Sequence, residues 1–206
     1  MRRYGGSHLH FFMKNILNSV ISQGSSVAIV GNGGSLKEKK DGNLIDSFDV
    51  VVRFNNFHIS EQYIKHVGSK TDLWSNTFYK DIKSRKEDLP ILCPLPLNMP
   101  GFTELYDTNI SLMMSNFQKT TFIPEYIYQD LCELMPNHKT RKRKDPSSGL
   151  CMIFWFLESG FTITKNNLFG FDFFSSTNHH YFSHGKSPSE NHEGHVEKEI
   201  LKSLII

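Results

Sequence analysis

The chain has 206 residues, of which 38% are hydrophobic, and a formal net charge of +2. This length supports one hydrophobic core rather than two, and the near-neutral charge argues against a nucleic-acid partner, which usually requires a strong basic bias. No apolar run reaches the ~18 residues that a membrane span needs, so we expect neither a signal peptide nor a membrane anchor.

The first predicted elements lie in the amino-terminal third. Apolar residues recur at helical spacing within residues 11–21, which predicts a first helix. Residues 26–30 form a short apolar run that predicts a buried strand, and it leads into a glycine turn over residues 31–36. Residues 48–54 are rich in β-branched side chains and predict a second strand, and residues 71–75 predict a third.

The next segments alternate between the two structure types. Residues 89–97 contain three prolines, so we expect them to be extended or irregular. Residues 124–134 open with Pro-Glu and predict a helix, and the apolar run 150–157 predicts a buried one. Residues 161–164 and 168–171 supply further strand material.

The chain ends with a polar segment and a helix. Residues 175–191 are rich in Ser, His and Asn and predict a mobile loop, and residues 193–204 predict a charged helix. Strands that alternate with helices predict an α/β fold, here a Rossmann-like domain whose mostly parallel sheet is flanked by helices. Ligands bind such sheets at the carboxyl ends of the strands.

Three predicted strands end in an asparagine: Asn32, Asn55 and Asn76. An amide side chain both donates to a phosphate oxygen and accepts from a ribose hydroxyl, so the three together suit a hydroxyl-rich ligand with one phosphate. The alternative is that each asparagine bonds its own backbone in a turn. The glycine turn predicts backbone amides that face a phosphate. An NAD site is not expected, because Leu36 stands where the third glycine of that fingerprint belongs.

Two further features concern anions and metals. Ser147, Ser148 and Gly149 open the predicted buried helix, where hydroxyls and amides favour an anion, although they also suit a plain helix cap. The sequence has no Asp-x-Asp pair for a divalent ion. Its three cysteines form no CxxC pair, so we expect neither a zinc site nor a disulfide framework.

These motifs resemble those of the eukaryotic-type sialyltransferases, glycosyltransferase family 29. Residues 27–55 resemble the large sialylmotif, residues 146–171 the small one, and residues 179–182 the short third motif. Residues 192–197, HEGHVE, have the His-x4-Glu form of the last motif. Residues 170–173 are also similar to the bacterial sialyltransferases of family 42. The resemblance implies a single GT-A-like catalytic domain over residues 1–206 that takes CMP-sialic acid as its donor.

The resemblance also assigns roles to individual residues. His192 would be the general base that takes the proton of the acceptor hydroxyl, Glu197 would orient it, and His180 would donate to the leaving phosphate. The family 42 pattern instead gives the role of base to His184. The CMP-activated donor would be bound by a set of strand-end, turn and loop residues: Asn32, Gly33, Ser35, Asn55, Asn76, Ser147, Ser148, Gly149 and Tyr181.

The expected function is therefore an inverting, metal-independent transfer of sialic acid to a glycan hydroxyl, without a cofactor. The alternatives are transfer of another CMP-activated ulosonic acid such as Kdo, or a catalytically silent module that binds nucleotide or glycan. Val27 stands where the animal enzymes have the first cysteine of a disulfide, and nothing near residues 159–160 replaces the second. These departures predict a soluble bacterial enzyme in the cytoplasm or at the inner membrane face. The expected acceptor is a surface lipooligosaccharide or capsule precursor.

Overall fold

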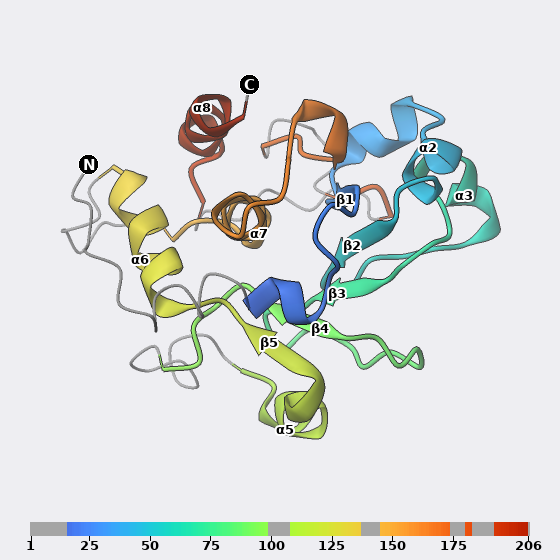
Figure 1. Ribbon diagram of the computed structural model, residues 1–206. Coiled ribbons are helices and arrows are strands. Elements are labelled where there is room, and N and C mark those ends of the chain that lie inside the picture. Colours follow the sequence, from blue (N-terminus) through green and yellow to red (C-terminus); the bar gives the residue numbers. More distant parts are fainter. Residues whose placement is uncertain (1–15, 99–107, 137–144, 174–179, 183–191, 206) are drawn as a thin grey trace.

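The computed structural model describes residues 16–98, 108–136, 145–173, 180–182 and 192–205 (Figure 1). Their strands form one six-stranded sheet in the order β5-β4-β3-β2-β1-β6, in which every neighbouring pair is parallel. The strands are β1 (Val27–Val30), β2 (Val50–Phe54), β3 (Leu73–Ser75), β4 (Ile91–Cys93), β5 (Thr120–Phe122) and β6 (Leu168–Phe169). The predicted α/β class with a parallel sheet is confirmed.

Helices cover both faces of this sheet. In Figure 1, α6, α7 and α8 gather on one side of the molecule and α2 and α3 on the other. The α-helices are α2 (Gly42–Asp46), α3 (Glu61–Val67), α5 (Ile110–Asn116), α6 (Glu125–Leu134), α7 (Ser148–Glu158) and α8 (Gly194–Leu204). The 3-10 helices are η1 (Ile16–Ser19), η2 (Gly34–Glu38), η3 (Phe117–Lys119) and η4 (Lys165–Asn167).

The side chains of β1 show why helices must pack on both faces of the sheet. Val27 and Ile29 join the core that includes α6 and α7, whereas Ala28 and Val30 join a smaller core with Ile45 of α2. All four β1 residues are buried, as expected for a strand with helices on both faces. The continuous apolar run of β1 is thus a direct consequence of its central place in the sheet.

Helix α7 is buried on all sides, as its apolar sequence predicts. Every residue from Leu150 to Phe156 is buried, and Trp155 is fully enclosed. The hydroxyl of Ser147 accepts a hydrogen bond from the amide of Leu150 and caps the start of the helix. The predicted helices α6 and α8 are also confirmed, with Pro124 directly before the first residue of α6.

Several expected elements differ in the structure. The proline-rich segment is extended, as expected, and also contains the regular strand β4, because Pro90 precedes it and Pro94 follows it, so neither interrupts the ladder. Residues 161–164 form no strand, although Phe161 and Ile163 are buried. Of the predicted first helix only the short η1 is present, and residues 11–15 lie outside the described residues.

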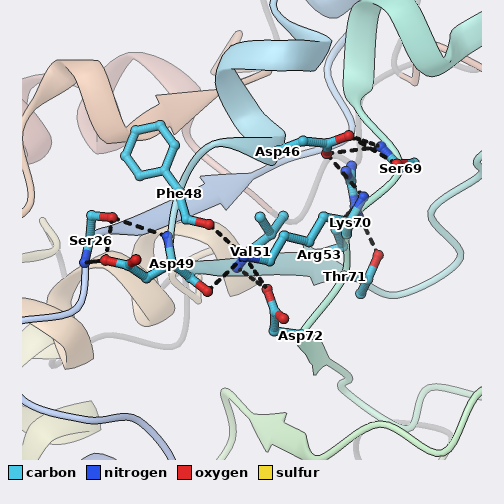
Figure 2. Close-up of polar contacts among 10 residues, drawn as sticks. All are labelled: Ser26, Asp46, Phe48, Asp49, Val51, Arg53, Ser69, Lys70, Thr71 and Asp72. Carbon is cyan, nitrogen blue, oxygen red and sulfur yellow. Dashed lines mark hydrogen bonds and ion pairs between the residues drawn. The ribbon is translucent and has the colours of Figure 1, made fainter.

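Polar contacts tie together the amino ends of the central strands (Figure 2). Asp72, before β3, accepts from the amide of Val51, and Asp46 accepts from the amide and hydroxyl of Ser69. Arg53 is 1% exposed and donates to carbonyl oxygens of Val67 and Lys70. Burial lowers the pKa of Arg53 to about 10. Arg53 belongs to a strand-end motif, but its side chain stabilises the fold and does not reach the carboxyl edge of the sheet, where a ligand would bind.

The order in which strands are added to the sheet reverses at β1. Successive strands run outward from β1 to β5, and the chain then returns to place β6 on the other side of β1. A reversal of strand order of this kind places a ligand crevice at the carboxyl ends of the neighbouring strands. Only two residue pairs join β1 to β6 within the sheet.

Candidate functional site

A cavity of about 220 Å³ lies at this crevice. It receives residues from the ends of β1, β2 and β6, from the start of α7 and from the segments around residues 180 and 192. Its lining consists of Gly31, Asn32, Gly33, Phe54, Asn55, Ser147, Ser148, Gly149, Leu150, Ile153, Gly170, Phe171, Asp172, Phe173, His180, His192 and Glu197. Segments far apart in the sequence thus meet where a parallel sheet ordinarily binds its ligand.

Asn32 presents a fixed amide group to this cavity. Its Nδ2 donates to the carbonyl oxygen of Phe54 at 3.1 Å, which identifies the other side-chain atom as the acceptor oxygen. This Oδ1 is buried and has no hydrogen-bond partner among the described residues. A buried acceptor without a partner costs free energy, so the position favours a ligand with a hydroxyl or amino donor.

The glycine turn has a different role from the one expected. The amide of Gly31 donates to the carbonyl of Phe169 at 2.8 Å, and the amide of Gly33 donates to that of Gly170 at 3.0 Å. A Cβ atom on Gly33 would lie 2.5 Å from that carbonyl oxygen. These glycines therefore allow two loops to approach each other closely, and the Gly33 amide predicted to face a phosphate has a partner within the chain.

Ser35, also predicted to contact the donor, is held by the loop that follows β6. Its amide donates to Oδ2 of Asp172 at 2.9 Å, and its hydroxyl donates to Oδ1 of the same carboxylate. Ser35 does not line the cavity, whereas Asp172 does. Sequence reasoning missed Asp172, because nothing in the chain order signals a contact between residues 35 and 172.

Two strand-end asparagines occupy different places. Asn55 lines the cavity, and its Oδ1 accepts from the amide and hydroxyl of Thr77 at 3.2 and 3.3 Å. Asn76 is fully buried outside the cavity lining, and its Oδ1 accepts from the amide of Phe78 at 2.7 Å. The structure therefore does not bring Asn76 to the site. It forms the turn that bonds its own backbone, which was the alternative interpretation.

The start of α7 combines a cap with exposed donors. The carboxylate of Glu197 is 2% exposed and accepts from the amide of Ser147 at 2.8 Å and from its hydroxyl at 2.5 Å. An internal anion thus already occupies the first position of the expected anion site. Ser148 and Gly149 also line the cavity and carry the next amides of the helix start. A Cβ on Gly149 would lie 2.6 Å from the Phe171 ring, so the aromatic ring packs directly on this turn.

His192 lies beside this cap and has a defined tautomer. Its Nδ1 is 2.9 Å from the backbone carbonyl oxygen of Asp145, which can only accept, so Nδ1 carries the proton of the neutral ring. The basic nitrogen of the ring is then Nε2. Oε1 of Glu197 lies 3.9 Å from Nδ1, too far for a hydrogen bond but close enough to attract a protonated ring. Burial raises the pKa of Glu197, against the hydrogen bonds from Ser147 and the charge of His192.

The third predicted motif contributes one lining residue and one anchor. His180 lines the cavity, and its ring stacks on that of Phe182. Tyr181 is 1% exposed; its hydroxyl accepts from the amide of His58 and donates to the carbonyl of the same residue. The Tyr181 amide donates to the backbone carbonyl of Asn32 at 2.8 Å. Tyr181 therefore anchors the segment behind the site and does not line the cavity, and His184 lies outside the described residues.

Aromatic side chains that were not predicted as site residues complete the lining. Phe54 and Phe171 meet edge to face with ring centroids 6.2 Å apart, and Phe173 also lines the cavity. The adjacent helix α7 contributes the side chains of Leu150 and Ile153. Such a wall, with a few directed polar groups, is typical of a pocket for an organic ligand that carries a flat ring. Within the described part of the chain, no helix is long and apolar enough to span a membrane.

Comparisons with known proteins relate this chain to the sialyltransferases. The family model described as glycosyltransferase family 29 (sialyltransferase) matches residues 15–88. The chain is 24% identical over 216 residues to the beta-1,6-galactosyltransferase GALT29A of Arabidopsis thaliana, a match that covers 92% of this chain and 54% of that protein. It is 27% identical over 194 residues to the human alpha-2,8-sialyltransferase 8E, covering 80% and 49%. The chain therefore spans about half the length of these relatives.

Solved structures show the same fold. A crystal structure of a mammalian sialyltransferase matches with a TM-score of 0.63 and 18% identity, covering 98% of this chain and 77% of that one. A mammalian sialyltransferase in complex with Gal-beta-1-3GalNAc-ortho-nitrophenol matches with a TM-score of 0.62 and 20% identity, covering 98% and 78%. The amino-terminal part of the chain thus resembles family 29, and the fold of the chain is that of the solved sialyltransferases.

Proposed function

We propose that the chain is an inverting sialyltransferase that moves sialic acid from CMP-sialic acid to a glycan hydroxyl, as one catalytic domain. One observation carries this proposal: five segments selected from the sequence, which contain Asn32, Asn55, Ser148, His180 and His192, converge on a single cavity. The relation to family 29 supplies the class of donor. The presence of His192 and Glu197 at this cavity also argues against a catalytically silent binding module, because such a module needs no general base.

The donor would lie between the strand ends and α7. The unpartnered Oδ1 of Asn32 would accept a hydrogen bond from a ribose hydroxyl, and the aromatic wall of Phe54 and Phe171 would contact the flat base. The amides of Ser148 and Gly149 would face an anionic group of the donor, since they lie at the positive end of the α7 dipole. The amide and hydroxyl of Ser147 already donate to Glu197. We therefore assign Ser147 to the helix cap rather than to the binding of the CMP-activated sugar.

The transfer itself would be a single displacement. The acceptor hydroxyl oxygen attacks the anomeric carbon of sialic acid, the bond from that carbon to the phosphate oxygen breaks, and CMP leaves. The hydroxyl proton passes to Nε2 of His192, and the carboxylate of Glu197 stabilises the resulting imidazolium. His180 would donate a hydrogen bond to the leaving phosphate, whose charge grows as the bond breaks. Attack from the face opposite to the leaving group inverts the anomeric centre.

A comparison of three sugar donors tests the proposal. The protein is incubated with a galactose-terminated acceptor, such as Gal-beta-1-3GalNAc or lactose, and with CMP-sialic acid, CMP-Kdo or a nucleotide-activated galactose in separate reactions. Product with CMP-sialic acid alone is the expected result. Transfer from CMP-Kdo would move the assignment to another ulosonic acid, and transfer from the galactose donor would favour the activity named for the Arabidopsis relative. CMP binding without any transfer would favour the binding module.

Metal independence requires a separate measurement. We expect calorimetry with CMP to give the same affinity with and without EDTA, because amides and histidines would supply the donors to phosphate. A loss of affinity on chelation would refute this part of the proposal. We further propose that a surface lipooligosaccharide or capsule precursor is the natural acceptor, and transfer to such a precursor rather than to a glycoprotein glycan would support it.

A further inference from the structure

A recurrent contact in this chain is a serine that donates both its amide and its hydroxyl to one carboxylate; we call it a serine clamp. Two clamps lie at the amino ends of the strands and appear in Figure 2, and two others lie at the cavity. The pairs are Ser26 with Asp49, Ser69 with Asp46, Ser35 with Asp172, and Ser147 with Glu197. The two positions provide a comparison between a clamp that holds the fold and a clamp that holds the site.

The clamp between Ser35 and Asp172 joins the loops that follow β1 and β6, two strands whose pairing is short. Strands β1 and β6 share only two residue pairs, and the cavity lies at their carboxyl ends. Past the strand ends, the amides of Gly31 and Gly33 still donate to the loop after β6. The carboxylate of Asp172 adds the amide and hydroxyl of Ser35 to this series. It thus extends the contact between the two loops by one further residue pair beyond the glycines.

Asn32 lies between the two glycines that are held in this way. Its side-chain Nδ2 is fixed on the Phe54 carbonyl, so the direction of the buried Oδ1 depends on where the turn places its backbone. Asp172 also packs tightly on the turn, because a Cβ on Gly33 would lie 2.6 Å from its Cγ. A shift of the carboxylate would therefore move the turn.

We propose that Asp172 is a positioning residue, which clamps the glycine turn through Ser35 and thereby sets the position of Asn32 for the donor. The inference rests on the proposed function, since it takes a CMP-activated sugar as the ligand that Asn32 binds. It also reassigns Ser35 from a contact with the donor to a part of the clamp.

Calorimetry with CMP on four proteins tests the consequence for binding: the wild type, Asp172→Asn, Ser35→Ala and the double variant. We expect each single variant to bind CMP about tenfold more weakly, because a charge-assisted hydrogen bond is lost, and the double variant to lose little more. Asp49→Asn, which breaks the equivalent clamp away from the cavity, should bind CMP like the wild type. Unchanged affinity in Asp172→Asn, or additive losses in the double variant, would overturn the positioning role.

A second readout needs no ligand. The side-chain amide resonances of Asn32, followed by nitrogen-15 NMR, should shift in Asp172→Asn and in Ser35→Ala and stay in place in Asp49→Asn. If the wild type binds no CMP, the proposed function fails, and these resonances still decide whether Asp172 positions Asn32. Resonances that stay unchanged in both cavity variants would overturn the inference even in a protein that binds CMP.

Discussion

Replacing Glu197 with Gln removes a buried charge beside the proposed base and preserves the size of the side chain. Oε1 of Glu197 lies 3.9 Å from Nδ1 of His192, whose ring becomes positive when it takes the acceptor proton. Two unit charges at this separation interact by about 1 kcal/mol in water and by about 4 kcal/mol at an effective dielectric constant of 20. Because the proton is only partly transferred in the transition state, we expect kcat to fall by about tenfold to a hundredfold.

The same substitution changes stability in two opposing ways. The Gln side chain loses one of the two acceptor oxygens that bind Ser147. However, burial raises the pKa of Glu197, so the charged form carries a cost that Gln avoids. We therefore expect the free energy of unfolding at neutral pH to change by less than about 2 kcal/mol. Since the native state binds this proton more tightly than the unfolded state, the wild type should gain stability relative to the variant as the pH falls through the raised native pKa.

The matched control is Glu199→Gln on the same helix. Glu199 is exposed and pairs with Lys202 at 2.8 Å, so its loss should leave kcat unchanged. The assay is initial-rate turnover of CMP-sialic acid, with CMP affinity from calorimetry and thermal melting in parallel. We expect Glu197→Gln to lose kcat while it retains CMP affinity. If it keeps the kcat of the control and only melts earlier, the carboxylate is a structural cap and the reasoning is wrong.

Three further predictions concern acid stability, the base and helix packing. Burial raises the pKa of Asp46, but hydrogen bonds from residues 69 and 70 outweigh this and lower it, so Asp46→Asn should melt earlier at pH 7. That difference should shrink as the pH falls through the lowered pKa of Asp46 and vanish once the native carboxyl is protonated, and a constant difference would contradict it. His192→Ala should lose 10²–10⁴-fold in turnover with CMP affinity retained; a larger loss in a separate His184→Ala would give the role of base to His184. Gly42→Ala should cost about 3 kcal/mol in denaturant unfolding, because its Cβ would meet a backbone carbonyl of α3. The control Gly160→Ala has open space and only a positive φ, so we expect about 1 kcal/mol, and equal costs would refute the clash.

The sequence predicted the central elements well because burial on both faces leaves a continuous apolar run. This holds for β1 and for α7, whose residues are buried almost throughout. It fails at the sheet edge, where β5 is half-buried and its run Thr120–Phe122 has no apolar pattern to find. It fails in the opposite sense at Phe161, which is buried without pairing in a strand. Apolar residues report burial, whereas strand pairing also depends on neighbours that only the folded chain supplies.

The candidate site was predicted to a similar extent. Asn32, Asn55 and His192 reach the cavity, because motif positions at strand ends and at a helix start converge in any parallel sheet of this kind. Asn76 follows a strand as well, yet its side chain closes its own turn. Asp172 could not be found, since its partner lies 137 residues earlier in the chain. Local sequence indicates which residues lie near a strand end, but not which partner takes each of their polar groups.

The cavity clamps imply how this site would handle an anionic donor. Carboxylates of the protein hold the hydrogen-bond donors of Ser35 and Ser147, two residues that were predicted to bind the CMP-activated sugar. An anionic ligand would gain nothing by displacing a carboxylate that already accepts two hydrogen bonds. The amides at the start of α7, beyond Ser147, also line the cavity and lie at the positive end of that helix's dipole. We therefore expect the negative charge of the CMP-activated sugar to lie at the α7 end of the cavity, next to His192. This placement would bring the anomeric carbon close to the base.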